Sequence, residues 1–126
     1  MAERYSSFTK GGRLWLWQRI TAAFLIVVLA FHFFLLHFVH HADEVTFAMS
    51  AGRMQQWSYY SLMILFLVTA TFHGVNGVYN ALVNAGLTGA KRRVIQVVLG
   101  VASLLLLVQG VRTANAWAGI DLLPIL

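Results

Sequence analysis

The clearest pattern in the sequence is three long stretches that contain no charged side chain. No Asp, Glu, Lys or Arg occurs between Ile20 and Ala42, between Met54 and Ala90, or between Val94 and Val111. Each stretch approaches or exceeds the roughly 18 apolar residues that mark a membrane-spanning helix. The pattern therefore predicts an all-α integral membrane protein with three transmembrane helices.

The helices are expected over about residues 13–40, 54–84 and 91–116. A short amphipathic lead, Met1–Gly12, precedes them, and an outer loop (41–53) and a cytoplasmic turn (85–89) connect them. The only proline, Pro124, lies in the tail, so proline interrupts no helix. Residues 1–126 are predicted to form one membrane domain. Since three hydrophobic helices make a thin bundle, we expect partner helices.

Composition supports the membrane assignment and narrows the chemistry. Hydrophobic residues make up 60% of the chain and charged residues 10%, which is far too little charge for a soluble domain of this length. The absence of cysteine excludes disulfides, iron–sulfur ligation and cysteine catalysis within this chain. The apolar stretch Leu14–Val39 is too long for a signal peptide and no small-residue cleavage site follows, so we expect this segment to be retained.

The basic residues predict an orientation in the membrane. Seven lie before or within the start of the first span or between the second and third: Arg4, Lys10, Arg13, Arg19, Lys91, Arg92 and Arg93. Only Arg53 and Arg112 lie on the other side, where Asp43, Glu44 and Asp121 also lie. The bias predicts a multi-pass protein of the cell membrane with a cytoplasmic N-terminus and an outer C-terminus. It also argues that the net charge of +5 is a topology signal, and that nucleic acid is no partner.

Polar side chains within the spans are candidates for function, because lipid offers no hydrogen-bond partner. His73 is the most informative, since Gly77, Asn80 and Asn84 share its helix face and Gly74 flanks it. Glycines beside the histidine leave room for a flat macrocycle, and the asparagines form a polar stripe toward the cytoplasm. Alternatively, the histidine is hydrogen-bonded to a neighbouring helix and the glycines permit close packing. The pattern leaves both interpretations open.

The first span contains two more histidines, His32 and His37, in its outer half. His32 shares a face with Gln18 and Thr21, whereas His37 lies nearer the outer surface. Counting from different helix ends places His32 and His73 about 4 Å or about 12 Å apart in depth, so whether one haem could lie between them stays open. A metal site formed by His37, His40 and His41 is disfavoured, because no carboxylate ligand of fixed geometry is near.

The third span shows no ligand. Small and polar residues recur at spacings of three and four, which predicts a seam packed against a neighbouring helix: Gln96, Gly100, Ser103, Leu107 and Gly110. The chain has no nucleophile–base pair, phosphate loop or carboxylate dyad. It is therefore predicted to perform no substrate chemistry alone.

Two segments carry a family resemblance. The sequence QRITA (Gln18–Ala22), followed in the second span by HGVNGVYNALVN (His73–Asn84), resembles the hydrophobic membrane anchor subunit of prokaryotic succinate dehydrogenase. The length and the three-helix layout are also similar, so the resemblance covers essentially the whole chain. It implies a cytochrome b subunit that works with a flavoprotein subunit, an iron–sulfur subunit and a second cytochrome b membrane subunit, and that passes electrons to membrane quinone.

The resemblance also implies roles for individual residues. His73 matches an axial ligand of haem b, whose other ligand comes from the partner cytochrome subunit, and Arg19 matches a position near the haem propionates. His32 matches a ligand of a second haem present in some relatives, with His37 as its rival. Asn80 and Asn84 are then expected near the haem propionates or the quinone.

One position departs from the family pattern. Many relatives have an Asp-Tyr pair eleven and twelve residues after the haem histidine, where the tyrosine bonds the quinone. Asn84 and Ala85 occupy these positions here. A tyrosine contact at this point is therefore missing, although Asn84 can donate a hydrogen bond.

Two alternatives accompany this interpretation. A fumarate reductase anchor has the same machinery run in reverse, and the sequence does not distinguish the two. A haem-free structural or transport subunit would use its histidines only to bond helices together. The optical spectrum of the purified complex separates the haem-free alternative from the other two, because haem b changes its absorbance on reduction.

Overall fold

The computed structural model describes residues 10–39 and 41–120. Its elements are α1 (Lys10–Phe34), the π-helical turn η1 (Leu35–Val39), the 3-10 turn η2 (Ala42–Glu44), α2 (Phe47–Met54), α3 (Trp57–Asn84) and α4 (Gly89–Ala118). These ranges contain no strand, and three of their helical segments are long and apolar enough to cross a membrane. The predicted all-α fold class with three membrane-spanning helices is confirmed.

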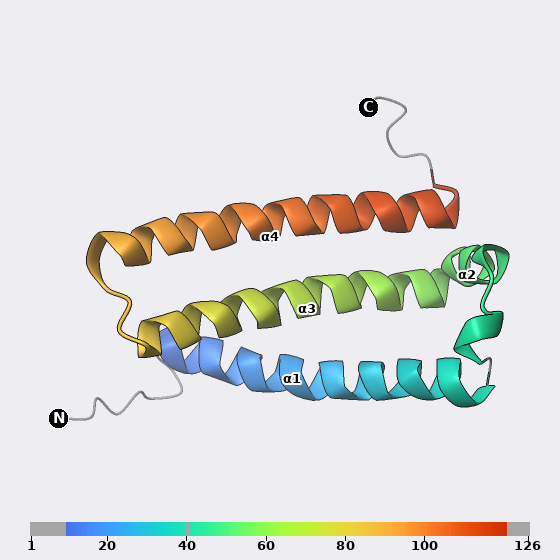
Figure 1. Cartoon of the computed structure of the whole chain (residues 1–126), viewed down its shortest axis with the longest axis horizontal. Coiled ribbons are helices and arrows are strands. Elements are labelled where there is room, and N and C mark those ends of the chain that lie inside the picture. Colours follow the sequence, from blue (N-terminus) through green and yellow to red (C-terminus); the bar gives the residue numbers. More distant parts are fainter. Residues whose placement is uncertain (1–9, 40, 121–126) are drawn as a thin grey trace.

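The three long helices lie side by side and antiparallel, with α3 between α1 and α4 (Figure 1). Both outer helices contact α3. The start of α1 and the α3–α4 turn lie at one end of the molecule, and α2 lies at the other end (Figure 1). The turn includes Gly86 and Gly89, at φ 94° and 60°, where a side chain would be strained. Helix α3 therefore has two different neighbours on two faces.

The segment expected to be an outer loop, 41–53, contains a helix instead. Helix α2 begins after Thr46, whose hydroxyl accepts a hydrogen bond from the backbone nitrogen of Met49 at 3.3 Å. Phe47 packs on Trp117 with ring centroids 4.5 Å apart, which joins α2 to α4. Eight residues are too few for a membrane span, so the hydrophobic pattern did not reveal this helix. The helix-capping threonine is the local signal that was missed.

The helix ends differ from the expected ranges in one way that affects the site. Helix α1 begins at Lys10 and α4 begins at Gly89, both earlier than expected. A helix can include charged residues near a membrane surface, because their long side chains extend toward water. Arg13 and Arg19 thus lie on α1 itself and are exposed. Most of the expected lead, the proline-containing tail and His40 lie outside the described residues.

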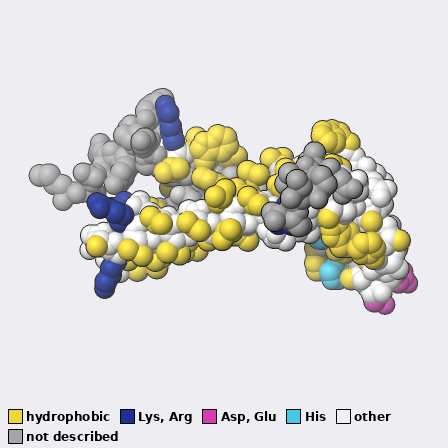
Figure 2. Space-filling model, turned by 90° about the horizontal axis from the view of Figure 1, so that it is seen from above, with side chains coloured by type: hydrophobic (Ala, Val, Ile, Leu, Met, Phe, Trp, Pro, Cys, Tyr) yellow, Lys and Arg dark blue, Asp and Glu magenta, His cyan; other side chains and the backbone are white. Residues whose placement is uncertain are grey.

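The described residues form no buried core of the kind found in soluble proteins. Val28 is the one buried hydrophobic residue among them, and no large side chain is fully buried. Hydrophobic side chains cover the middle of the molecule, while Lys and Arg gather at the end with the α3–α4 turn and Asp and Glu lie at the opposite end (Figure 2). Such a surface requires lipid or partner helices to cover it.

Candidate functional site

A cluster of four polar side chains joins α1 to α3 within the membrane-spanning region. We call Gln18, Thr21, His73 and Asn76 the α1–α3 polar cluster. The amide nitrogen of Gln18 donates to the backbone carbonyl of His73 at 3.0 Å, and its carbonyl oxygen accepts from Nδ2 of Asn76 at 2.7 Å. The hydroxyl of Thr21 lies 3.1 Å from Nδ1 of His73. The cluster therefore fixes both the backbone and the ring of His73 against α1.

The bonds of Thr21 favour one tautomer of His73. The Thr21 hydroxyl can donate its single proton to backbone carbonyls of α1, at 2.8 Å to Trp17 and 3.2 Å to Gln18. Its oxygen is then available to accept from Nδ1–H of His73. In that tautomer Nε2 keeps its lone pair, the form in which an imidazole ligates a metal. Thr21 itself is buried, with an 8% exposed surface.

The glycines beside His73 behave differently from each other. A Cβ on Gly77 would lie 3.3 Å from the amide nitrogen of Gln18, so this glycine admits the glutamine. A Cβ on Gly74 would meet nothing within 4 Å, so the space beside it is open. Both glycines were predicted to make room for a macrocycle. Gly77 instead makes room for the side chain of Gln18, and Gly74 leaves open space.

The contact between Thr21 and His73 also sets the relative depth of the histidines. His32 follows Thr21 by eleven residues on the same helix face, which corresponds to about 16 Å along the axis. The separation exceeds both values allowed by the sequence, because α1 begins earlier than expected. His32 and His73 are too far apart to ligate one iron. If both bind haem, they bind different ones.

The two candidate outer ligands have different surroundings. His32 is half-buried and makes no hydrogen bond within residues 10–39 and 41–120. His37 is exposed; its Nδ1 donates to the backbone carbonyl of Phe33 at 3.0 Å, and the two rings stack with centroids 4.1 Å apart. It lies in the π-helical turn η1, a type of turn that often occurs at functional sites. Neither histidine is singled out by these contacts.

The other predicted site residues lie apart from the α1–α3 polar cluster. Arg19 is exposed, with its guanidinium 5.0 Å from the centroid of the Trp15 ring. Asn80 and Asn84 are exposed on α3 and make no hydrogen bond to any described residue. No three His, Asp or Glu side chains gather into a metal-binding group in the described ranges. The disfavoured alternative of His37, His40 and His41 includes His40, which falls outside them.

The seam predicted on the third span does face α3, but it is tight at one end only. A Cβ on Gly110 would lie 2.6 Å from Cδ2 of Leu67, so the Leu67 side chain packs directly over the bare backbone of this glycine. Nearby, the hydroxyl of Tyr60 donates to Oδ1 of buried Asn115 at 2.5 Å. A Cβ on Gly100 would meet nothing within 4 Å, and a cavity lies between the helices at that point.

Sequence reasoning singled out His73 and placed Gln18 and Thr21 on the helix face of His32, but it did not predict that these two side chains bond to α3. Gln18, Thr21 and His32 lie on one face of the first span. The pattern therefore grouped Gln18 and Thr21 with His32. In the structure they bond to His73 or Asn76 of α3. The polarity of Gln18 and Thr21, at the same membrane depth as His73, was the signal that these side chains need a partner. Identifying the partner requires the relative position of the two helices.

A chain whose described residues form three membrane-length helices, with a histidine hydrogen-bonded between two of them, belongs to the class of multi-pass membrane proteins with an intramembrane histidine site. The chain belongs to the succinate dehydrogenase/fumarate reductase transmembrane subunit family, whose model matches residues 2–109. It is therefore a membrane subunit of an enzymatic complex and works with other subunits.

The chain is also similar to an archaeal protein. Over 91 residues it is 29% identical to the succinate dehydrogenase hydrophobic membrane anchor subunit of Archaeoglobus fulgidus, covering 72% of this chain and 77% of that protein. No solved structure matches the chain significantly.

Proposed function

We propose that the chain is the membrane anchor and cytochrome b subunit of a succinate dehydrogenase, in which His73 ligates haem b. Family membership supports the complex. The observation that supports the ligand is the hydrogen bond between Nδ1 of His73 and Thr21, because it leaves the Nε2 lone pair for iron. A histidine ligand commonly donates its other ring N–H in this way, which orients the ring and raises its basicity.

The residues around His73 fit haem with one rearrangement. The amide nitrogen of Gln18 lies 3.4 Å from Nε2 of His73, so this side chain must rotate away before Nε2 meets iron. The open space at Gly74 lies beside the residue that follows His73 in α3. Haem b, when bound, supplies one-electron transfer. In this chain His73 holds it, Thr21 orients His73, and Arg19 is the proposed partner of the propionates.

The proposed complex has four subunits in the cell membrane. A flavoprotein subunit oxidises succinate, an iron–sulfur subunit relays electrons, and a second cytochrome b subunit provides the other axial ligand of the haem at His73. This chain takes no part in succinate chemistry, and it contributes to the quinone site, where Asn80 and Asn84 are proposed contacts. A second haem near the outer surface is proposed at His32, with His37 as the rival.

His73→Ala in the purified complex tests the proposal. The reduced-minus-oxidised spectrum should lose the haem nearest the cytoplasm, whereas succinate oxidation with an artificial acceptor should be preserved. Asn80→Ala on the same helix is the matched control and should retain the haem at His73. An unchanged spectrum with unchanged midpoint potentials in His73→Ala would show that the histidine only bonds the helices.

The outer haem is tested in the same way. His32→Ala should remove one haem signal and leave the signal assigned to His73, while His37→Ala should have a smaller effect. The reverse ranking would transfer the outer ligand to His37. If the complex shows a single haem signal, and neither His32→Ala nor His37→Ala changes that signal, the proposed outer haem site is wrong.

The proposed orientation places the α3–α4 turn in the cytoplasm and 41–53 outside. Single cysteines at Thr88 and Ala42 are suitable probes, because the chain has no cysteine of its own and both positions are exposed. An impermeant thiol reagent should label Ala42→Cys in intact cells and Thr88→Cys only after lysis. The opposite labelling would reverse the orientation.

A further inference from the structure

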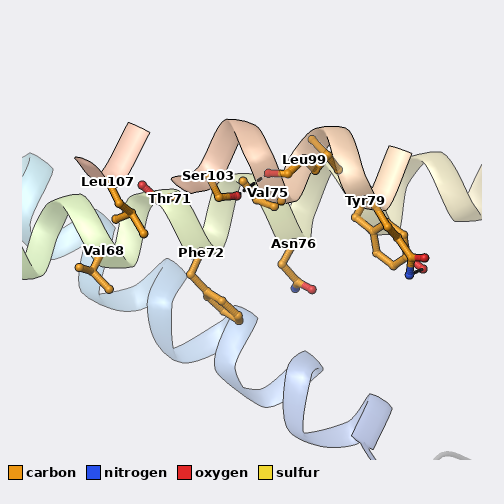
Figure 3. Close-up of a pocket in the computed structure, with 11 residues that line it drawn as sticks. Val68, Thr71, Phe72, Val75, Asn76, Tyr79, Leu99, Ser103 and Leu107 are labelled. Carbon is orange, nitrogen blue, oxygen red and sulfur yellow. Dashed lines mark hydrogen bonds between the residues drawn. The ribbon is translucent and has the colours of Figure 1, made fainter. Parts of the chain in front are cut away.

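A cavity of about 430 Å³ lies between α3 and α4, within the size range of small-molecule sites. Apolar side chains of both helices form most of its lining, with Tyr79 at one end and Val68 and Leu107 at the other (Figure 3). Among the described residues, Asn76 is the one that belongs both to this lining and to the α1–α3 polar cluster. The proposed haem ligand does not line the cavity, so most of this space has no role in the site around His73.

The end of the cavity near the α3–α4 turn adjoins an arginine that is held in place. Nε of Arg92 donates to the hydroxyl oxygen of Tyr79 at 2.7 Å, and Nε2 of Gln96 donates to the same oxygen at 2.9 Å. The guanidinium of Arg92 lies 5.7 Å from the centroid of the Tyr79 ring. Its two Nη groups make no hydrogen bond to any residue in 10–39 or 41–120. They are therefore donors that a ligand can use.

No carboxylate in the described ranges balances this charge. Asp43 and Glu44 are the acidic residues there, and they lie at the opposite end of the molecule from the Lys and Arg side chains of the α3–α4 turn (Figure 2). Lys91 and Arg93 add two more positive charges beside Arg92. A guanidinium with both Nη groups unused presents a planar pair of donors, which matches two oxygens of a phosphate. The charge distribution therefore favours an anionic ligand.

The length of the cavity matches one leaflet of a bilayer. Arg92 lies in the first turn of α4, where a long side chain reaches the membrane surface. From Gln96 to Leu107 the lining follows α4 for about 16 Å, which is about half of the roughly 30 Å thickness of the hydrocarbon core. One acyl chain spans the same depth. The two ends together fit a molecule with an anionic head and a hydrocarbon chain.

We propose that the α3–α4 cavity binds one anionic phospholipid, with its phosphate on the Nη groups of Arg92 and one acyl chain along α4 past Gly100. Basic pockets between transmembrane helices bind anionic headgroups, and in the proposed orientation the lipid comes from the cytoplasmic leaflet, which is rich in them. The inference goes beyond the proposed function and does not depend on haem.

Three rival occupants each use only part of the site. A quinone has no negative charge to pair with Arg92. Inorganic phosphate pairs with Arg92 and leaves the apolar length empty, and so does an acidic segment of a partner subunit at the membrane surface. The phospholipid uses both the free Nη groups and the apolar lining.

Arg92→Gln tests the headgroup contact in the purified, delipidated complex. Phosphatidylglycerol is titrated into the complex in detergent, and native mass spectrometry counts the bound lipids. The wild-type complex should bind one phosphatidylglycerol about tenfold more tightly than phosphatidylcholine, and Arg92→Gln should lose this preference with its charge-assisted hydrogen bonds.

Lys91→Gln is the matched control, because it removes the same charge from an exposed position one residue earlier, about 100° around α4 from Arg92. It should bind phosphatidylglycerol within about twofold of wild type, since salt screens an exposed charge that does not contact the lipid. An equal loss in Lys91→Gln would overturn the inference, because it would attribute the preference to the overall charge of this end.

Gly100→Phe tests the apolar length, because the new ring occupies the space that is open beside Gly100. It should weaken phosphatidylglycerol binding and leave Arg92 in place, and inorganic phosphate should not displace the lipid. Equal binding in wild type, Arg92→Gln and Gly100→Phe would overturn the inference. Displacement of the lipid by inorganic phosphate or by a short-chain quinone would also overturn it, as would release of a partner subunit from Arg92→Gln with lipid binding unchanged.

Discussion

Toward α1, helix α3 presents His73 and Asn76, and both side chains are hydrogen-bonded in the α1–α3 polar cluster. Toward α4, the same helix is hydrogen-bonded near its two ends, through Tyr60 and Tyr79, and between them Leu67 meets Gly110 in a contact that has no hydrogen bond. The first contact is directional and fixes the rotation of a ring. The second is a van der Waals contact, which requires only that the two surfaces touch. They touch at Gly110, and a cavity remains between the helices at Gly100.

This comparison shows how one helix can serve two purposes. A polar contact in lipid specifies the position of a functional side chain, since an unbonded polar group is costly there. A glycine contact permits close approach at one level, and it leaves the neighbouring levels free to form a cavity. His73 thus lies on the face of α3 that is bonded to α1, and a cavity lies on the face packed against α4.

The largest expected effect comes from filling the glycine contact. Gly110→Leu should destabilise the membrane domain by about 3 kcal/mol, because even its Cβ would lie 2.6 Å from Leu67. Gly100→Leu is the matched control and should cost less than about 1 kcal/mol, since nothing lies within 4 Å of its Cβ position. Unfolding in denaturing detergent measures both.

The sequence predicts a packed seam that includes Gly100 as well as Gly110, so this pair of variants also decides between sequence and structure. Equal losses for Gly110→Leu and Gly100→Leu would show that the seam is tight along its whole length. The further change Leu67→Ala should partly rescue Gly110→Leu, because it removes the atoms that clash.

A smaller effect is expected from the hydrogen bond at the outer end of the α3–α4 contact. Tyr60→Phe removes the donor to Oδ1 of Asn115, which is 8% exposed, and should cost about 1–2 kcal/mol. The same detergent titration measures the loss. Tyr59→Phe should be neutral, and an equal loss in that control would attribute the effect to general changes at the membrane interface.

The smallest change in stability, with the most specific readout, is expected in the α1–α3 polar cluster. Thr21→Val should cost about 1 kcal/mol or less, in line with hydrogen bonds between membrane helices. If His73 ligates haem, losing the acceptor on Nδ1–H lowers the basicity of the ligand and should raise the midpoint potential of that haem. A potentiometric titration followed optically measures it.

Thr21→Ser is the control for this prediction, because it keeps the hydroxyl and should keep the wild-type potential. A merely structural role for Thr21 would lower stability in Thr21→Val and leave the potential where it was. If Thr21→Ser shifts the potential as far as Thr21→Val, the methyl group is responsible and the proton assignment on His73 is wrong.

Much of the fold was readable from the sequence, because the cost of placing charge in lipid separates the spans from the connections. The same cost identified His73 as a candidate, since few polar side chains remain at depth. The outer helix α2 escaped this reasoning, as its eight residues have no membrane-length pattern. The early start of α1 escaped it too, because the added turn begins with the charged Lys10 and two glycines, which give no hydrophobic signal.

The sequence by itself determined that three helices cross the membrane and that the α3 span carries a histidine among glycines and asparagines. Only the tertiary structure decided that Thr21 and Gln18 meet His73, that His32 lies about 16 Å away along α1, and that Tyr79 ends a cavity. The physical reason is that hydropathy limits the depth of each helix to within several residues. Helix rotation and register depend on contacts between side chains from distant parts of the chain.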